Sequence, residues 1–212
     1  MRIVTVTVTV TVTVALALLV RSARADRVWH DGYESPLSSW SAHVYDQSVK
    51  RRVRASLKVD SRTTNARANV SASDFRRSKS STDVVAHVVA NARLPDAAAA
   101  ELRAELRSTM ARIAAAGRKD NVANALAMAI TLSMIVLEKP EYDLAKADEL
   151  VTNVNDALAA SPRFRRLGPA ERQVMYDSAL LSAAVIALVH QSGDKAASQA
   201  IAKNVLLALT GD

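Results

Sequence analysis

Cysteine is absent from the 212 residues of this chain. Its absence excludes disulfide bonds, a thiol nucleophile, zinc–thiolate sites and iron–sulfur clusters. Glycine is also scarce, with five residues in the whole chain, too few for a glycine-rich loop that cradles phosphate groups. Stability must therefore come from core packing, and nucleotide-binding enzymes are disfavoured.

The first 25 residues have the three parts of a cleavable secretory signal peptide. Arg2 and the amino terminus are positive, residues 3–20 are uncharged, and Ala23-Arg24-Ala25 has the small-x-small pattern of a cleavage site. A retained membrane anchor is the alternative, because a span needs roughly 20 apolar residues. Five threonines alternate with valine in this stretch and make it a poor span. We therefore predict export to the periplasm or the extracellular medium, a mature chain from about Asp26, and no transmembrane span after cleavage.

Charge divides the remaining chain into two parts. The formal net charge is +7, and residues 26–82 hold 11 Lys and Arg against 6 Asp and Glu, whereas residues 83–212 hold 14 against 15. Any electrostatic preference for a partner therefore lies in the first part.

Residues 26–81 are predicted to form an arm that is partly disordered. Its first part is rich in aromatic residues, which we expect to attach the arm to the rest of the protein, although they could instead stack on sugars or a peptide. From Val53 to Val59, apolar residues alternate with polar ones, which predicts a short edge strand, and the rest of residues 47–81 is typical of a solvated linker. The aromatic residues are Trp29, Tyr33, Trp40 and Tyr45.

From residue 82 onward the apolar spacing is helical, and helix stop signals separate six segments. The chain is therefore predicted to be all-α, with a domain of about six mostly antiparallel helices in an up-and-down bundle over residues 82–212. The expected helices begin at Thr82 or Asp83, Pro95, Asp120 or Asn121, Asp143, Gly168-Pro169 and Asp194, and the third is expected to continue to about Lys139.

Two short elements carry a resemblance to a known family. The first is Lys119-Asp120-Asn121-Val122-Ala123-Asn124-Ala125 and the second is Glu171-Arg172-Gln173. Over roughly residues 83–212 the chain resembles an uncharacterised family of exported bacterial helical proteins with an N-x-A-D-A element and a downstream E-R-Q element. Asn124 stands where that family usually has Asp. The resemblance implies export and a helical fold, and it implies no activity.

The residues that usually carry catalysis or bind metals form no recognisable pattern. The four histidines lack metal-ligand spacing, and no nucleophile, phosphate-loop or calcium-loop motif occurs. Cations interleave with or adjoin the paired carboxylates Glu101/Glu105 and Asp148/Glu149, as on solvated helix faces. We therefore predict no catalytic residue, no metal site and no cofactor. The histidines are His30, His43, His87 and His190.

Asn121 and Asn124 are the most informative polar residues, because they begin the most apolar helix. Asn121 is expected to cap that helix, and Asn124 to point inward and bond to another helix or to the arm. Ligand binding at the two amides is the less favoured interpretation.

The basic run at Lys50, Arg51, Arg52 and Arg54 is the other candidate binding site. It could contact phosphate groups or an anionic membrane, whereas nucleic acid is not expected as a partner of an exported protein. The leading hypothesis is a non-enzymatic exported protein that binds an unknown protein or assembles at the cell envelope. An electrostatic binder of anionic envelope surfaces is the alternative, a hydrolase is a distant third, and the sequence does not fix the oligomeric state.

Overall fold

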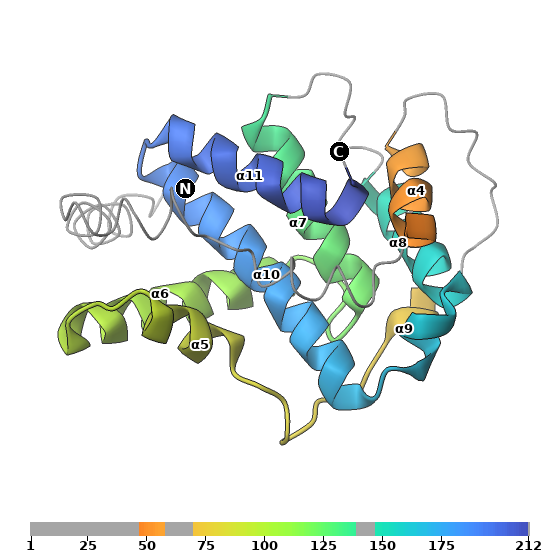
Figure 1. Cartoon of the computed structure of the whole chain (residues 1–212), viewed down its shortest axis with the longest axis horizontal. Helices are drawn as coiled ribbons and strands as arrows, with labels where there is room; N and C mark the ends of the chain where they lie inside the picture. Colours follow the sequence, from red (N-terminus) through yellow and green to blue (C-terminus); the bar gives the residue numbers. More distant parts are fainter. Residues whose placement is uncertain (1–46, 58–69, 139–146, 212) are drawn as a thin grey trace, which may run out of the picture.

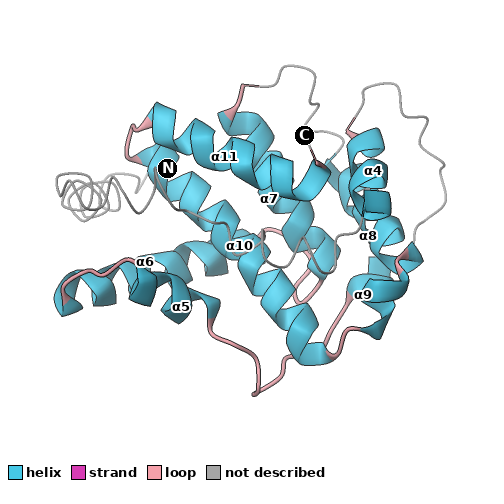
Figure 2. Ribbon diagram, in the orientation of Figure 1, coloured by secondary structure: helices cyan, strands magenta, loops and turns pink. Residues whose placement is uncertain are grey.

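A computed structural model of the protein describes residues 47–57, 70–138 and 147–211, and within these ranges all regular secondary structure is helical (Figure 2). The all-α prediction is confirmed for this part of the chain. The predicted signal peptide and the aromatic part of the arm lie outside the described residues. The up-and-down order of the helices stays a prediction.

The predicted helix starts agree with the observed ones wherever the structure describes them. Side chains of Asp83, Asn121 and Asp194 cap their helices by accepting a hydrogen bond from a backbone N–H, as N-cap residues do. The helices that the sequence predicted are α5 (Val84–Asn91), α6 (Asp96–Ala115), α7 (Val122–Val136), α8 (Ala147–Ala160), α10 (Pro169–Gln191) and α11 (Lys195–Thr210).

Helices α7 and α10 form the centre of the fold. Figure 1 shows α10 crossing the middle of the molecule, with α5 and α6 on one side and α7 and α11 on the other, and α7 also packs on α8. Most residues of both central helices are buried. Among the described residues, α10 is long and apolar enough to cross a membrane, but 78% of its most apolar window is buried inside the fold. The two helices that carry the family elements are therefore the core of the protein.

The predicted strand is wrong, because residues 47–56 form helix α4 (Gln47–Ser56). Val49 and Val53 lie one helical turn apart and are buried, and Leu57 packs against the same core. Helix α4 contacts α8 and α11. Apolar residues recur every four positions from Val49 onward, and this helical spacing determines the structure here rather than the alternation from Val53 to Val59. The prediction of a solvated linker is also wrong for this helix.

Two further differences concern the ends of helices. A short helix, α9 (Pro162–Arg166), follows α8 directly, with Ser161 as its cap and Phe164 buried. Helix α7 ends at Val136, three residues before the expected end, and Glu138 then has a positive φ of 52° that no α-helix continues through. A 3₁₀ helix, η1 (Val70–Ser73), precedes α5.

Candidate functional site

The basic residues predicted to bind a partner lie on the solvent side of α4. Arg51, Arg52 and Arg54 are exposed, and Lys50 is half-buried. The buried Val49 and Val53 hold this helix on α8 and α11, so its cations project from a packed helix. A fixed helix presents these charges together, which a solvated linker would not do.

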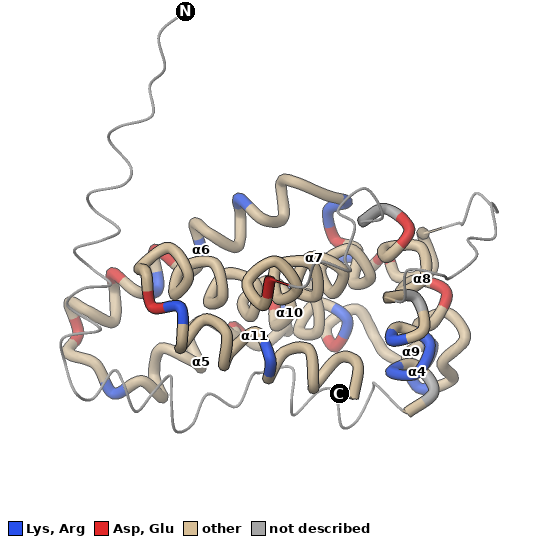
Figure 3. Tube along the Cα trace, turned by 90° about the horizontal axis from the view of Figure 1, so that it is seen from above, with Lys and Arg blue, Asp and Glu red and all other residues tan. Residues whose placement is uncertain are grey.

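Helix α9 adds three exposed arginines that the sequence prediction missed, Arg163, Arg165 and Arg166. Figures 1 and 3 both place α4 and α9 at the same end of the molecule, and α8 contacts each of them. We call the seven cations of α4 and α9 the basic end. Neither helix contains an acidic residue, and the three acidic residues of α8, Asp148, Glu149 and Asp156, leave an excess of positive charge.

Asn121 is the cap that the sequence predicted, and it is completely buried. Its Oδ1 accepts a hydrogen bond from the backbone N–H of Asn124 at 2.8 Å. Its Nδ2 donates to the backbone oxygen of Val70 and to Oδ1 of Asp74, each at 2.7 Å. One amide therefore caps α7 and at the same time fixes the chain around η1.

The backbone and a nearby ion pair strengthen this junction. Phe75 N donates to the oxygen of Asp120 at 3.0 Å, and Asp74 and Asn121 form an isolated antiparallel bridge. Arg118 Nε donates to Asp74 Oδ1 at 2.8 Å. Hydrogen bonding from the Arg118 guanidinium holds the pKa of Asp74 below its usual range, so this carboxylate is charged at neutral pH.

Within the described part of the chain, the Asn124 side chain makes no hydrogen bond to another helix or to the arm. Its Nδ2 lies 3.7 Å from Sδ of Met128, one turn further along the same helix. The side chain is 7% exposed and lies against the backbone of Gly117, where an added Cβ would come within 2.4 Å of Nδ2. Asn124 therefore fills a space that only a glycine at position 117 leaves open.

The second family element, at the start of α10, holds the same part of the chain. Glu171 Oε2 accepts from Gly168 N at 2.7 Å and caps the helix. Arg172 Nη1 donates to the backbone oxygens of Ala72 and Asp74 at 3.3 and 3.2 Å. Gln173 Oε1 accepts from Ser78 N at 2.7 Å.

Residues 70–81 thus connect the two family elements, and we call them the 70–81 segment. Helix α8 fixes this segment from a third side, because Asn155 Oδ1 accepts from N and Oγ of Ser73 at 3.1 and 2.9 Å. Both asparagines, Asn121 and Asn155, are buried, as polar groups with satisfied hydrogen bonds can be. Nothing in the sequence indicated that the two elements meet, and a solvated linker was predicted for this segment.

A group of titratable side chains lies at the far end of the segment. Arg77 Nε donates to Asp120 Oδ1 at 2.9 Å, and Arg77 Nη1 lies 3.8 Å from Asp177 Oδ1. The buried ring of Tyr176 packs edge-on against Phe75, with 5.3 Å between ring centroids. Burial raises the pKa of Asp177 and, likewise, the pKa of Tyr176. Arg77 and Phe75 of the segment thus contact Asp120, Tyr176 and Asp177.

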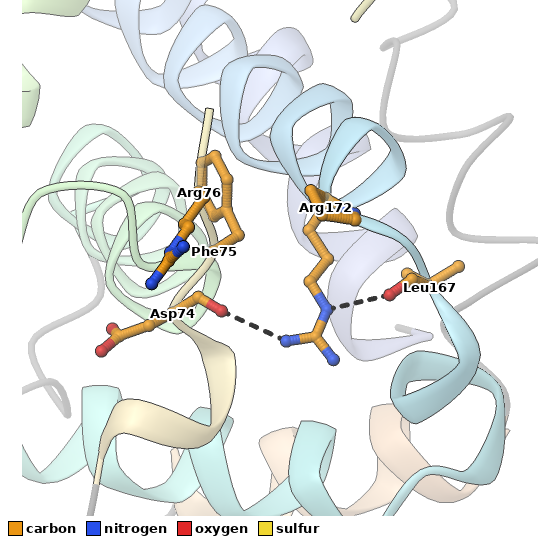
Figure 4. A pocket seen from close by; sticks show the side chains of 6 residues that line it. Asp74, Phe75, Arg76, Leu167 and Arg172 are labelled. Atoms are coloured by element: carbon orange, nitrogen blue, oxygen red, sulfur yellow. Dashed lines mark hydrogen bonds between the residues drawn. The ribbon is translucent and has the colours of Figure 1, made fainter. Parts of the chain in front are cut away.

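A pocket of about 410 Å³ opens where the 70–81 segment meets the start of α10 (Figure 4). It lies in the size range of small-molecule sites. Figure 4 shows Arg172 reaching from α10 toward the carbonyl oxygen of Asp74, while the Asp74 carboxylate points away from that guanidinium. Asp177 and Tyr176 do not line it. The lining residues are Asp74, Phe75, Arg76, Leu167, Pro169 and Arg172.

Within the described ranges, no group of three or more His, Cys, Asp or Glu residues is placed to hold a metal ion. The predicted residues fall at separate places: Asn121 and Asn124 at the start of α7, and the cations of α4 at the basic end. Of these, Asn121 contacts the 70–81 segment.

Comparison with known proteins identifies a family for this chain. A family of unknown function (DUF6683) matches residues 6–206, which is most of the chain. The match covers residues 47–81 as well, whereas the sequence resemblance was limited to roughly residues 83–212. No curated protein and no solved structure matches significantly.

Proposed function

This chain belongs to a family of unknown function (DUF6683), and we propose that it is a non-enzymatic exported protein that binds anionic surfaces of the cell envelope through its basic end. The observation that carries this proposal is the meeting of α4 and α9 at one end of the molecule. Seven cations lie there on two helices without an acidic residue.

The physical basis is electrostatic attraction between clustered cations and anionic headgroups. Each Lys or Arg close to an anionic membrane contributes about 1 kcal/mol to binding. Because α4 and α9 are held by buried Val49, Val53 and Phe164, no chain entropy is lost in bringing these cations together. Such binding weakens as salt rises, because the charges are exposed and are screened over about 10 Å at 0.1 M salt.

The test is co-sedimentation of the protein with vesicles of phosphatidylglycerol and phosphatidylcholine, and with vesicles of phosphatidylcholine alone. The variant replaces Arg51, Arg52, Arg165 and Arg166 by Ala, and its matched control replaces the exposed Lys79, Lys119, Lys195 and Lys203 by Ala. We expect the first variant to lose about 4 kcal/mol, or several hundred-fold in partitioning, and the control to lose far less. Equal losses in the two variants, or equal binding to neutral vesicles, would overturn the proposal.

A protein partner at the envelope, the leading hypothesis from the sequence, is distinguished by its salt dependence. Binding to a protein through an apolar surface would persist in high salt, whereas binding through the basic end would not. Pull-down from envelope extracts at low and at high salt, with the wild type and the arginine variant side by side, separates the two. Retention of the same partner by both proteins in high salt would favour the protein-partner hypothesis.

A further inference from the structure

Arg172 is a cation whose described partners are all neutral. Its Nε donates to the backbone oxygen of Leu167 at 3.2 Å, and its Nη1 donates to two further backbone oxygens. Its guanidinium carbon lies 4.5 Å from the centroid of the Phe164 ring. Among the described residues no carboxylate lies within ion-pair distance of Arg172, so none of them neutralises its charge.

The carboxylate in the pocket lining and the one that precedes Arg172 in the chain are engaged elsewhere. Asp74 is paired with Arg118 and also accepts from Asn121, and Glu171 accepts from Gly168 N. Nη2 of Arg172 has no hydrogen bond to a described residue, so the two N–H groups on Nη2 remain to donate. A half-buried guanidinium fixed in this way is pre-organised for an anionic oxygen, because little side-chain entropy is lost on binding.

The rest of the pocket combines an apolar wall with a second cation. Phe75, Leu167 and Pro169 supply the apolar surface. Arg76 is exposed and has no ion-pair partner in the described part of the chain. A small pocket with apolar walls and a few placed polar groups is typical of sites for organic ligands.

We propose that this pocket binds an organic carboxylate that carries a short apolar group, with the carboxylate on Arg172, the apolar group on Phe75, Leu167 and Pro169, and Arg76 adding positive charge to the lining. Such a ligand is favoured over inorganic phosphate, because phosphate has no apolar group to place on the apolar wall. This site is separate from the vesicle-binding function, since it uses none of the seven cations of the basic end. Either proposal therefore stands if the other fails.

The test is titration of the full-length protein with hexanoate, followed by amide chemical shifts in two-dimensional NMR. We expect saturable shifts near Leu167 and Phe75 with a dissociation constant of about 1 mM or tighter. Hexanamide has the same shape without the charge and should bind at least about tenfold more weakly. N-acetylleucine, which mimics the end of a peptide, then shows whether a fatty acid or a peptide terminus fits better.

Two variants locate the binding. Arg76→Glu reverses an exposed charge and should weaken hexanoate binding at least about tenfold, whereas Lys203→Glu on α11 makes the same charge change away from the pocket and should leave it unchanged. Arg172→Gln should also abolish binding. If the Arg172→Gln protein does not fold, the Arg76→Glu variant decides the matter. The proposal is overturned by any of four results: no saturable hexanoate shift, equal binding of hexanamide, inorganic phosphate binding as tightly as hexanoate, or equal losses in the two glutamate variants.

Discussion

The starts of α7 and α10 both hold the 70–81 segment, but they do so with different chemistry. At α7 the contact is a completely buried amide, Asn121, whose three hydrogen bonds reach the segment and the helix itself. At α10 the contacts come from half-buried Arg172 and Gln173, which bind backbone groups of the segment.

The two sides differ in whether water can replace the hydrogen bonds that a substitution removes. Loss of the Asn121 side chain would leave the buried backbone N–H of Asn124 without its partner, at the full cost of desolvation. By contrast, Ala72 is exposed, and its carbonyl can turn to solvent if Arg172 is lost. We therefore expect the α7 side to determine stability and the α10 side to tolerate change. The variants below are ordered from the largest expected effect to the smallest.

Asn121→Ala should destabilise the protein most, by about 3 kcal/mol, because it removes three hydrogen bonds and leaves the buried N–H of Asn124 unpaired. Urea unfolding measures the loss. The matched control is Asp194→Ala, which removes a cap with a single described bond, to Ala197 N, and should cost about 1 kcal/mol. Losses of equal size would show that Asn121 acts only as a cap.

Gly117→Ala should cost about 2 kcal/mol, because the new Cβ would meet the Asn124 amide. The backbone at Gly117 is not in the left-handed region, so the loss would come from this contact alone. The double variant Gly117→Ala/Asn124→Ala should recover most of the stability, and a double-mutant cycle by thermal unfolding measures the coupling. Additive effects would contradict the proposed contact.

Arg172→Met should cost about 1.5 kcal/mol, through the lost hydrogen bonds and the lost contact with the Phe164 ring. The expected loss is smaller than that of Asn121→Ala because solvent reaches this side. Arg165→Ala, on the exposed face of α9, is the control and should change stability little. A larger loss for Arg172→Met than for Asn121→Ala would reverse the comparison between the two helix starts.

The smallest effects should be two opposite dependences on pH. Burial raises the pKa of Asp177, so its contribution to stability is full below its unfolded value of 3.8 and is lost as pH rises through the folded pKa. Arg118 lowers the pKa of Asp74, whose contribution is full above 3.8 and is lost as pH falls through the folded pKa. Melts at low salt should therefore show Asp177→Asn stabilised and Asp74→Asn destabilised at pH 7. The Asp177 difference should vanish below pH 3.8, whereas the Asp74 difference should persist below pH 3.8 until the pH falls through the folded pKa of Asp74. Shifts of the same sign at pH 7 would contradict this assignment.

Much of the fold follows from local signals that the sequence displays. Asp83, Asn121 and Asp194 are cap residues placed directly before apolar helical spacing, so three helix starts could be predicted. Helix α4 was missed because seven alternating residues obscured the Val49–Val53–Leu57 spacing. Helix α9 was missed because five residues are too short to show a period.

The candidate site was predictable only in part. Asn121 was found because an amide at the start of an apolar helix has few other roles. The contacts of the 70–81 segment were not predicted, because Arg172 and Asn121 bind mostly backbone oxygens there. A backbone oxygen has no signature in the sequence. The pocket depends on the same long-range contacts and could not be derived from either element alone.

The partners of the 70–81 segment lie far along the chain, and this has a consequence for folding. Ser73 bonds to a residue 82 positions later, Ser78 to one 95 positions later and Ala72 to one 100 positions later. Closing such long loops is slow, because their entropy is lost before any contact repays it. Synthesis produces this segment before α7, α8 and α10, yet it can dock only after they have assembled. The order of docking is therefore the reverse of the order of synthesis, and the assembly rate of the three helices sets how long the segment is accessible to proteases.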